Sequence, residues 1–116
     1  MLTEIKSINA DAPVLVIFGG SPVRRDEVLQ LIKSIDIDIT AYGALNEDEG
    51  IQLLQNLPRI NLVMIGGRYN VEQRLRIKQF ISSNLSGTNI TEPGIEYPYN
   101  DQLIKNDIFK KLQNHH

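Results

Sequence analysis

The stretch that decides the fold is PVLVIFGGSP, at residues 13–22. Residues 13–18 form a continuous apolar run that ends at two glycines, which is typical of a strand buried on both faces of a parallel sheet. Ser21 is a favourable N-cap, and Pro22 suits the first helical position because its missing N–H would have no partner there. We therefore predict a strand, a glycine turn and a helix over residues 22–35. The apolar face of this helix consists of Val28, Leu31, Ile32 and Ile35.

The same kind of unit recurs further along the chain. Residues 37–42 alternate between apolar and polar, which predicts a strand more exposed than the first. Asn46 and Glu49 have the spacing of a capping box, and Pro58 ends the helix that they begin. A second apolar run, INLVMI at residues 60–65, again ends at two glycines. The buried face of the second helix consists of Ile51, Leu53, Leu54 and Leu57.

Two helices and a broken strand complete the pattern. Asn70 and Gln73 repeat the capping spacing at the start of a third helix. Residues 88–97 predict a fourth strand at an edge of the sheet, because a Pro-Gly pair interrupts it. A closing helix is predicted over residues 100–113. The buried faces of these two helices consist of Ile77, Phe80 and Ile81, and of Ile104, Ile108 and Leu112.

Strands that alternate with helices predict an α/β three-layer sandwich. We expect a parallel sheet of four strands, or five, in the order 2-1-3-4 when the predicted strands are numbered along the chain, as in flavodoxin-like folds. One domain spans residues 13–113. Residues 1–12 are either a tail or a short leading element, and residues 114–116 are a tail that ends in two histidines, read as a tag remnant or a free end.

The composition excludes several classes of protein. The chain has 116 residues, a net charge of −2 and no cysteine, so it has no disulfide framework, zinc–thiolate site or cysteine nucleophile. No apolar run approaches the roughly 20 residues that cross a bilayer, and residues 1–12 lack the apolar core of a signal peptide. The acidic balance argues against broad nucleic-acid binding. We expect a cytoplasmic protein that contacts neither membrane nor nucleic acid.

The two glycine turns mark the candidate site. In an open parallel sheet, ligands bind beyond the carboxyl ends of the strands, where the winding reverses. With the predicted strand order this crevice lies between the first and third strands, both of which end in Gly-Gly. Each turn leads into a helix N-terminus, where free N–H groups favour an anion. The predicted anion site consists of Gly19, Gly20, Ser21, Arg24, Gly66, Gly67 and Arg68.

Arginines near the two helix N-termini strengthen this prediction. Arg24, Arg25, Arg68 and Arg74 stand where the helix dipole disfavours cations, and a bound phosphate or carboxylate would offset that cost. The alternative is a solvated face of mixed charge, in which acidic neighbours pair with the arginines. These acidic neighbours are Asp26, Glu27 and Glu72. Neither turn matches the glycine-rich fingerprints of dinucleotide-binding or P-loop proteins.

Three further features have a functional and a structural interpretation. The acids at residues 47–49 are either metal ligands or the residues that a helix dipole favours in a first turn. Tyr69 either stacks on a ligand or belongs to the loop, and residues 97–99 (Tyr-Pro-Tyr) offer a partner or dimer contact. No Ser-His-Asp or Cys-His set is present, and Ser21 has no base. We therefore expect no catalytic residue, no cofactor and no metal.

From about residue 13 to 113, the order of elements resembles a response-regulator receiver domain. In that family an acidic pair follows the first strand, where this chain has Gly19-Gly20. The phosphoacceptor Asp ends the third strand, where this chain has Gly66 or Gly67. Thr91 is a loose match for the Ser or Thr that ends the fourth strand, and the family's Lys has no counterpart. The resemblance implies a degenerate receiver-like domain that cannot be phosphorylated on Asp.

Two functions follow from these observations. The first is a non-catalytic, receiver-like regulatory or protein-interaction module in signal transduction, working as a homodimer or with an unidentified protein partner. Its contact surface is expected near Tyr97, Tyr99 and Phe109. The second is binding of a small anion, a nucleotide or a phosphorylated metabolite, between the paired glycine turns.

Overall fold

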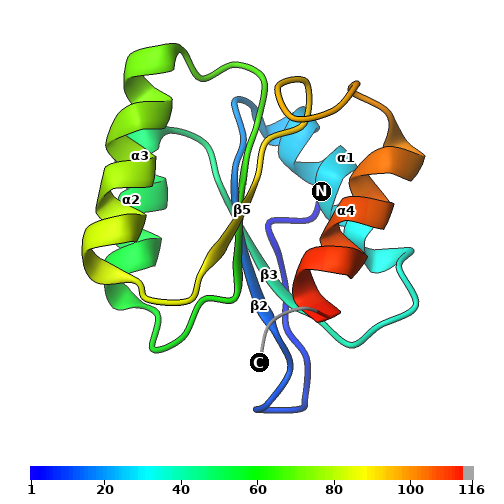
Figure 1. Cartoon of the computed structure of the whole chain (residues 1–116). Helices are drawn as coiled ribbons and strands as arrows, with labels where there is room; N and C mark the ends of the chain where they lie inside the picture. The colour runs from blue at the N-terminus through cyan, green and yellow to red at the C-terminus, as the bar shows by residue number, and fades with distance from the viewer. Residues whose placement is uncertain (114–116) are drawn as a thin grey trace.

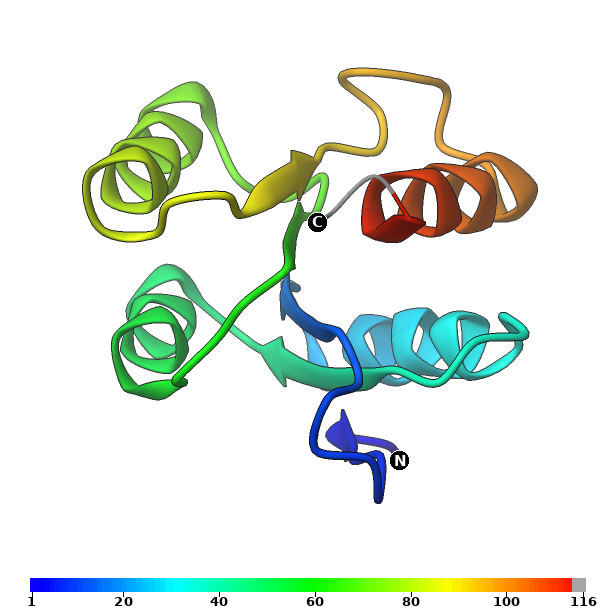
Figure 2. The same cartoon turned by 60° about the horizontal axis from the view of Figure 1, so that its bottom comes forward.

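The computed structural model describes residues 1–113, in which a mixed sheet lies between two pairs of helices (Figure 1). Helices α2 and α3 cover one face, and α1 and α4 cover the other, so the predicted α/β sandwich with three layers is confirmed (Figure 2). No described helix is both long and apolar enough to cross a bilayer. The elements are β1 Glu4–Ile5, β2 Val14–Phe18, α1 Pro22–Lys33, β3 Thr40–Ala44, α2 Glu47–Asn56, β4 Leu62–Ile65, α3 Val71–Asn84, β5 Asn89–Thr91 and α4 Asp101–Gln113.

The sheet has five strands in the order β1-β3-β2-β4-β5. The pairs β2–β3, β2–β4 and β4–β5 are parallel, whereas β1 pairs with β3 in the antiparallel direction. The predicted all-parallel sheet in the order 2-1-3-4 is therefore wrong as a description of the whole sheet. The strand that the prediction lacked is β1. It has only two residues, Glu4 and Ile5, which are too few to show an alternating pattern in the sequence.

Strand β2 is the centre of the core, as its apolar run predicts. Leu15 and Ile17 point to the side of α1 and α4, and Val16 and Phe18 point to the side of α2 and α3. All four side chains are at most 1% exposed, so this strand is buried on both faces. The helical residues that share these two core clusters with β2 include Leu29 and Ile32 of α1, Leu54 of α2, Ile77 and Ile81 of α3, and Ile104 and Ile108 of α4.

The predicted caps form at the start of three helices. The Ser21 hydroxyl accepts a hydrogen bond from the backbone N–H of Arg24 at 3.1 Å, and Pro22 is the first helical residue. Asn70 and Gln73 form a complete capping box, with bonds of 2.8 and 2.9 Å. The Asn46 side chain accepts from the backbone N–H of Glu49 at 2.8 Å, but among the described residues the Glu49 side chain does not return a bond to Asn46, so the predicted capping box is only half formed. These local bonds satisfy N–H groups that have no partner within the helix.

Helix α1 ends earlier than predicted, and strand β3 begins later. Helix α1 ends at Lys33. Two tight turns follow it, in which the backbone N–H of Ile35 donates to the Ile32 carbonyl and the backbone N–H of Ile37 donates to the Ile35 carbonyl. The predicted strand over residues 37–42 therefore begins only at Thr40 and extends to Ala44. Its last residues are small and carry no alternating pattern, which explains why the sequence places the strand too early.

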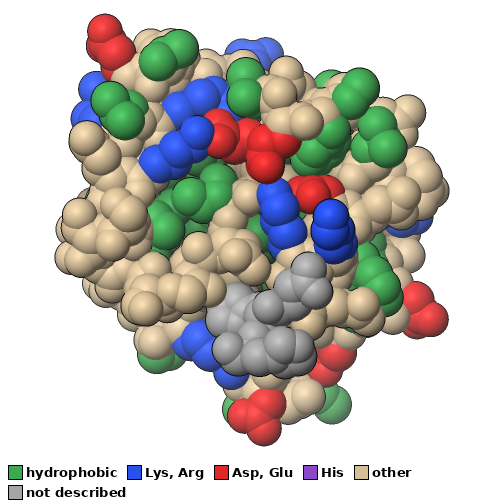
Figure 3. Space-filling model, viewed as in Figure 1, with side chains coloured by type: hydrophobic (Ala, Val, Ile, Leu, Met, Phe, Trp, Pro, Cys, Tyr) green, Lys and Arg blue, Asp and Glu red, His purple; other side chains and the backbone are tan. Residues whose placement is uncertain are grey.

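The strand β5 is shorter than the predicted 88–97 and lies at an edge of the sheet, as expected. Basic and acidic side chains interleave on the face of the molecule that carries it (Figure 3). Lys111 donates to the Ile90 carbonyl at 2.7 Å and pairs with Glu96 at 3.1 Å. Charges at an exposed edge oppose pairing with another strand, so β5 is poorly suited to extend the sheet into a second chain.

At the amino end, the backbone N–H of Leu2 donates to Asp26 of α1 at 2.6 Å, and β1 joins the sheet. Residues 1–12 thus contain a short leading element. The prediction of a C-terminal tail over residues 114–116, with His115 and His116, lies outside the described residues.

Candidate functional site

A cavity of about 420 Å³ opens beyond the carboxyl ends of β2 and β4. The structure brings all seven residues of the predicted anion site to its lining, because both glycine turns leave the sheet at this end. These residues are Gly19, Gly20, Ser21, Arg24, Gly66, Gly67 and Arg68. The lining also includes Ile17, Phe18, Val23, Glu27, Val28, Met64 and Tyr99.

Two hydrogen bonds hold the first glycine turn in place. The backbone N–H of Gly19 donates to the Ala44 carbonyl at 2.9 Å, and the Tyr69 hydroxyl donates to the Gly19 carbonyl at 2.7 Å. A Cβ atom on Gly20 would lie only 2.4 Å from Cδ of Arg68. The absence of a side chain at Gly20 therefore lets Arg68 cross from the second turn onto the first.

The second turn is close to the backbone of β2 on one side and open on the other. The backbone N–H of Gly66 donates to the Phe18 carbonyl at 2.9 Å, and a Cβ atom on Gly66 would lie 2.9 Å from that oxygen. A Cβ atom on Gly67 would meet no atom within 4 Å. Gly66 is thus needed for packing, whereas Gly67 borders empty space in the cavity wall.

The two arginines of the cavity are in different electrostatic states. The Arg24 guanidinium pairs with Glu27 at 3.0 Å and lies 4.6 Å from the centre of the Tyr99 ring. Arg68 is exposed and forms no ion pair with any residue in the described part of the chain. Two arginines and one glutamate leave the lining with an excess of positive charge, and that charge resides on Arg68.

The other two predicted arginines do not line this cavity. Arg74 is only 7% exposed, and its guanidinium donates to the carbonyls of Tyr69 and Gly66 at 2.9 and 2.7 Å and to Glu92 at 2.7 Å. Arg25 packs against Gly43, where a Cβ atom would lie 2.5 Å from Cγ of the arginine. Both arginines therefore pack within the fold. The prediction that they contribute to the anion site at the glycine turns is wrong, because neither lines that cavity.

Tyr69 packs in the core. Its side chain is 7% exposed and meets the Phe18 ring edge-on, with the ring centres 5.9 Å apart. Burial raises the pKa of Tyr69 to about 12, and the nearby charges of Glu47 and Glu49 add to the effect. The hydroxyl is therefore neutral at physiological pH and acts as a donor to Gly19.

The acidic run at residues 47–49 matches its structural interpretation. Glu47 accepts two hydrogen bonds from Arg76 of α3, at 2.7 and 2.8 Å, and these bonds lower the pKa of Glu47 below its ordinary value. Among residues 1–113, no group of three or more His, Asp or Glu side chains is arranged to hold a metal ion. The run thus forms the first turn of α2, and Glu47 links α2 to α3.

Residues 97–99 divide between core and cavity. The Tyr97 hydroxyl shares a 2.7 Å hydrogen bond with Thr91, which is fully buried and also donates to Asp107 at 2.6 Å. Thr91 does not line the cavity. Tyr99 is 46% exposed and forms part of the cavity wall.

Sequence reasoning missed the apolar half of the cavity. Val23, Met64 and Tyr99 come from three separate segments, and Tyr99 reaches the lining only because the loop after β5 returns to the start of α1. Met64 alone carried a local signal, as the last residue but one of the strand that ends in Gly-Gly.

No family model, no curated protein and no solved structure matches this chain. The resemblance to receiver domains gains no support from these comparisons and stays a prediction.

Proposed function

We propose that this protein is a non-catalytic binding module that takes a small organic anion in the cavity between its two glycine turns. The observation that carries the proposal is the position of Arg68. Its side chain crosses the cavity lining over Gly20, and it has no carboxylate partner among the described residues. A guanidinium binds phosphate or carboxylate through paired, charge-assisted hydrogen bonds.

The backbone around Arg68 also favours an anion. Within residues 1–113, the N–H groups of Gly20, Ser21, Gly67 and Arg68 take part in no backbone–backbone hydrogen bond. They lie just before the N-termini of α1 and α3, where the helix dipole is positive. Donors on two neighbouring turns, together with one free cation, suit an anionic group at the mouth of the cavity.

The size and the walls of the cavity limit the rest of the ligand. A volume of about 420 Å³ lies in the usual range for small-molecule sites, roughly 300–1,000 Å³. One side of the lining is apolar, formed by Val23, Met64 and Tyr99. The ligand class that fits is therefore a molecule with an anionic group and an apolar or flat body, such as a nucleotide or a phosphorylated metabolite.

The same lining carries no acid–base pair for catalysis. Glu27 is the single carboxylate that lines the cavity within residues 1–113, and it is paired with Arg24. The turns that would bear the acidic residues of a receiver domain carry glycines instead. These features support a receiver-like module that binds a ligand in place of being phosphorylated on Asp.

A second candidate function is contact with another protein, including a second copy of this chain. Several large apolar side chains are exposed on α4 and on the loop that precedes it: Ile95, Tyr99, Leu103 and Phe109, between 39% and 65% exposed. Light scattering over a range of concentrations tests for a homodimer. A mass that rises to that of two chains, and that Phe109→Ser returns to one chain, supports this function.

Thermal denaturation with a panel of phosphate, mononucleotides, dinucleotides and Mg²⁺ tests the anion proposal. A ligand that binds only the folded protein stabilises it by about 2.7 kcal/mol at a hundredfold excess over Kd. We expect a higher Tm with an organic phosphate, and none of this rise in Gly67→Val, whose added side chain fills open space in the cavity wall. Lys110→Ala on α4 is the control. A panel that leaves the wild-type Tm unchanged would contradict the proposal.

A further inference from the structure

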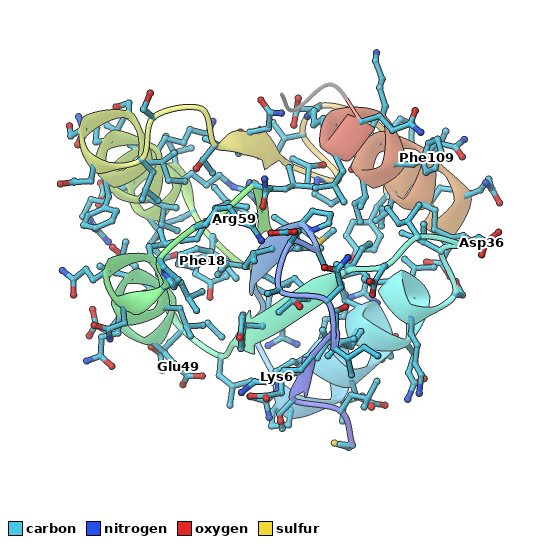
Figure 4. All side chains as sticks on the ribbon, turned by 90° about the horizontal axis from the view of Figure 1, so that it is seen from below. Lys6, Phe18, Asp36, Glu49, Arg59 and Phe109 are labelled. Atoms are coloured by element: carbon cyan, nitrogen blue, oxygen red, sulfur yellow. The ribbon has the colours of Figure 1, made fainter. Side chains whose placement is uncertain are left out.

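A second cavity, of about 410 Å³, lies at the opposite end of the sheet. It is enclosed by the segment that joins β1 to β2, by the start of β3 and by the turn that follows α2. Figure 4 shows this end of the molecule, with Lys6 and Arg59 labelled. Because the first cavity opens at the carboxyl ends of the strands, the two cavities share no lining residue.

The charge of this second lining is entirely positive. Lys6 and Arg59 both line it, and no Asp or Glu of the described residues does. Lys6 pairs with Glu4, which lies outside the lining and 3.6 Å from the Lys6 ammonium group. Both side chains of that pair are largely exposed, so water weakens the attraction and Lys6 is available to a ligand.

Arg59 is held in place by the segment above it. One guanidinium nitrogen, Nη2, donates to the carbonyls of Ala10 and Ala12, at 3.1 and 2.7 Å. The other two nitrogens, Nη1 and Nε, donate to no protein atom among residues 1–113. The protein thus fixes the guanidinium at the cavity and leaves part of its hydrogen-bonding capacity unused, which reduces the entropy lost on binding.

The segment itself is ordered by short bonds. The backbone N–H of Ser7 donates to the Thr40 hydroxyl at 3.1 Å, and the backbone N–H of Ala12 donates to the Asn9 carbonyl at 3.1 Å. Ser7, Asn9 and Thr40 all line the cavity, so hydroxyl and amide groups share the lining with the two cations.

From this arrangement we infer that the second cavity binds a small dianion of the phosphate-monoester type. Two cations without a lining carboxylate favour a group with two negative charges over a monocarboxylate. The hydroxyl and amide groups suit the several acceptor oxygens of a phosphate. This site is independent of the anion site at the glycine turns.

Chemical-shift mapping of the ¹⁵N-labelled chain with glycerol 3-phosphate, sulfate and acetate tests the inference. We expect glycerol 3-phosphate and sulfate to shift the amides of residues 6–12, 40–42 and 57–59, and acetate to leave them in place. A phosphate monoester gains its second charge near pH 6, so its affinity should rise about tenfold from pH 5 to pH 7.5. Sulfate is a dianion throughout and should show no such rise.

Substitutions of the two cations give the second readout. We expect Arg59→Gln to weaken glycerol 3-phosphate binding about tenfold, and Lys6→Gln about threefold because the exposed Lys6 side chain is also attracted to Glu4. Lys110→Gln, on the exposed side of α4, makes the same charge change away from both cavities and should leave the affinity unchanged. Arg59→Gln also removes the bonds to Ala10 and Ala12, so Lys6→Gln is the variant that tests the charge alone.

The outcomes separate this inference from the proposed function. Shifts confined to residues 19–24 and 66–68 would overturn the second site and leave the first intact. Shifts confined to residues 6–12, 40–42 and 57–59 would support the second site even if the first binds nothing. Equal responses to acetate and sulfate would overturn the second site. Unchanged affinity for glycerol 3-phosphate in both Lys6→Gln and Arg59→Gln would overturn it as well.

Discussion

The Arg74 guanidinium donates to the Glu92 carboxylate at 2.7 Å, and both side chains are more than nine-tenths buried. The same guanidinium also donates to the Gly66 carbonyl at 2.7 Å. Arg74 therefore joins the glycine turn after β4 to the end of β5, where the loop that carries Tyr99 begins. Lys78 forms a second ion pair with Glu92, so one buried carboxylate is shared by two cations.

This network predicts a large loss of stability in Arg74→Met. Removing one partner of a buried ion pair costs about 3–5 kcal/mol, because it leaves the other charge buried without its full compensation. The free energy of unfolding, measured by urea denaturation at pH 7, should fall by about that amount. Arg76→Met removes an arginine of the same helix from an exposed pair and should cost about 1 kcal/mol or less. Equal losses in the two variants would contradict the assigned role.

The same carboxylate predicts acid sensitivity. Burial alone would raise the pKa of Glu92, but hydrogen bonds from Lys78 and Arg74 lower it below its ordinary value of 4.5. The unfolded chain therefore binds this proton more readily, so the stabilisation is present above about pH 4.5 and is lost as the pH falls through the lowered pKa. In Glu92→Gln, the free energy of unfolding should depend less on pH below 4.5 than in the wild type. Identical pH profiles would argue against this assignment.

Gly50→Ala is predicted to destabilise the protein although alanine is the better helix former. Helix propensity alone favours alanine by about 1 kcal/mol. In the structure, however, a Cβ atom on Gly50 would lie 2.0 Å from the buried Phe18 ring, which has no room to move. We expect a net loss of about 1–3 kcal/mol in the free energy of unfolding. Gly67→Ala, where the Cβ atom meets open space, should be nearly neutral. A Tm raised by Gly50→Ala would show that this packing is wrong.

For the anion site, Arg68→Ala should weaken binding of an organic phosphate by about 1–3 kcal/mol. Arg24→Ala should weaken it by a different route, because it leaves the Glu27 carboxylate unneutralised in the cavity lining. The double variant Arg24→Ala/Glu27→Ala should then recover most of the affinity, whereas Arg68→Ala/Glu27→Ala should not. Calorimetric titration of these four variants and of Glu27→Ala alone measures these differences. Additive effects of Arg24→Ala and Glu27→Ala would exclude the explanation that Arg24 acts by neutralising Glu27.

Tyr69→Phe should cost about 0.5–1.5 kcal/mol, since it removes the 2.7 Å hydrogen bond to the Gly19 carbonyl without opening a cavity. Because the pKa of Tyr69 is raised to about 12, the wild type should also lose stability as the pH rises above 10, where the unfolded chain ionises first. Tyr69→Phe has no hydroxyl to ionise at this position, so its free energy of unfolding should fall less than that of the wild type above pH 10. Denaturation at pH 7 and pH 11 measures both effects.

Much of the fold follows from local sequence. The apolar run of β2, the caps Ser21, Asn46 and Asn70, and the helical spacing of Ile104, Ile108 and Leu112 each act over a few residues. The strand and helices that these features produce can therefore be predicted without knowledge of distant contacts. The pairing of the two Gly-Gly turns is likewise predictable, because both strands that precede them are strongly apolar and end at the same edge of the sheet.

Only the tertiary structure decided which arginines near those turns can contact a ligand and which ones serve the packing of the fold. Four arginines near two helix N-termini look alike in the sequence, yet Arg74 is buried on Glu92, Arg25 lies against Gly43 and Arg24 pairs with Glu27. Arg68, by contrast, lines the cavity and has no carboxylate partner among the described residues. The local sequence pattern also predicts neither the strand β1 nor the place of Tyr99 in the cavity wall. The physical reason is that burial and ion pairing depend on neighbours that are distant along the chain, whereas caps and periodicity depend on neighbours within one turn or strand.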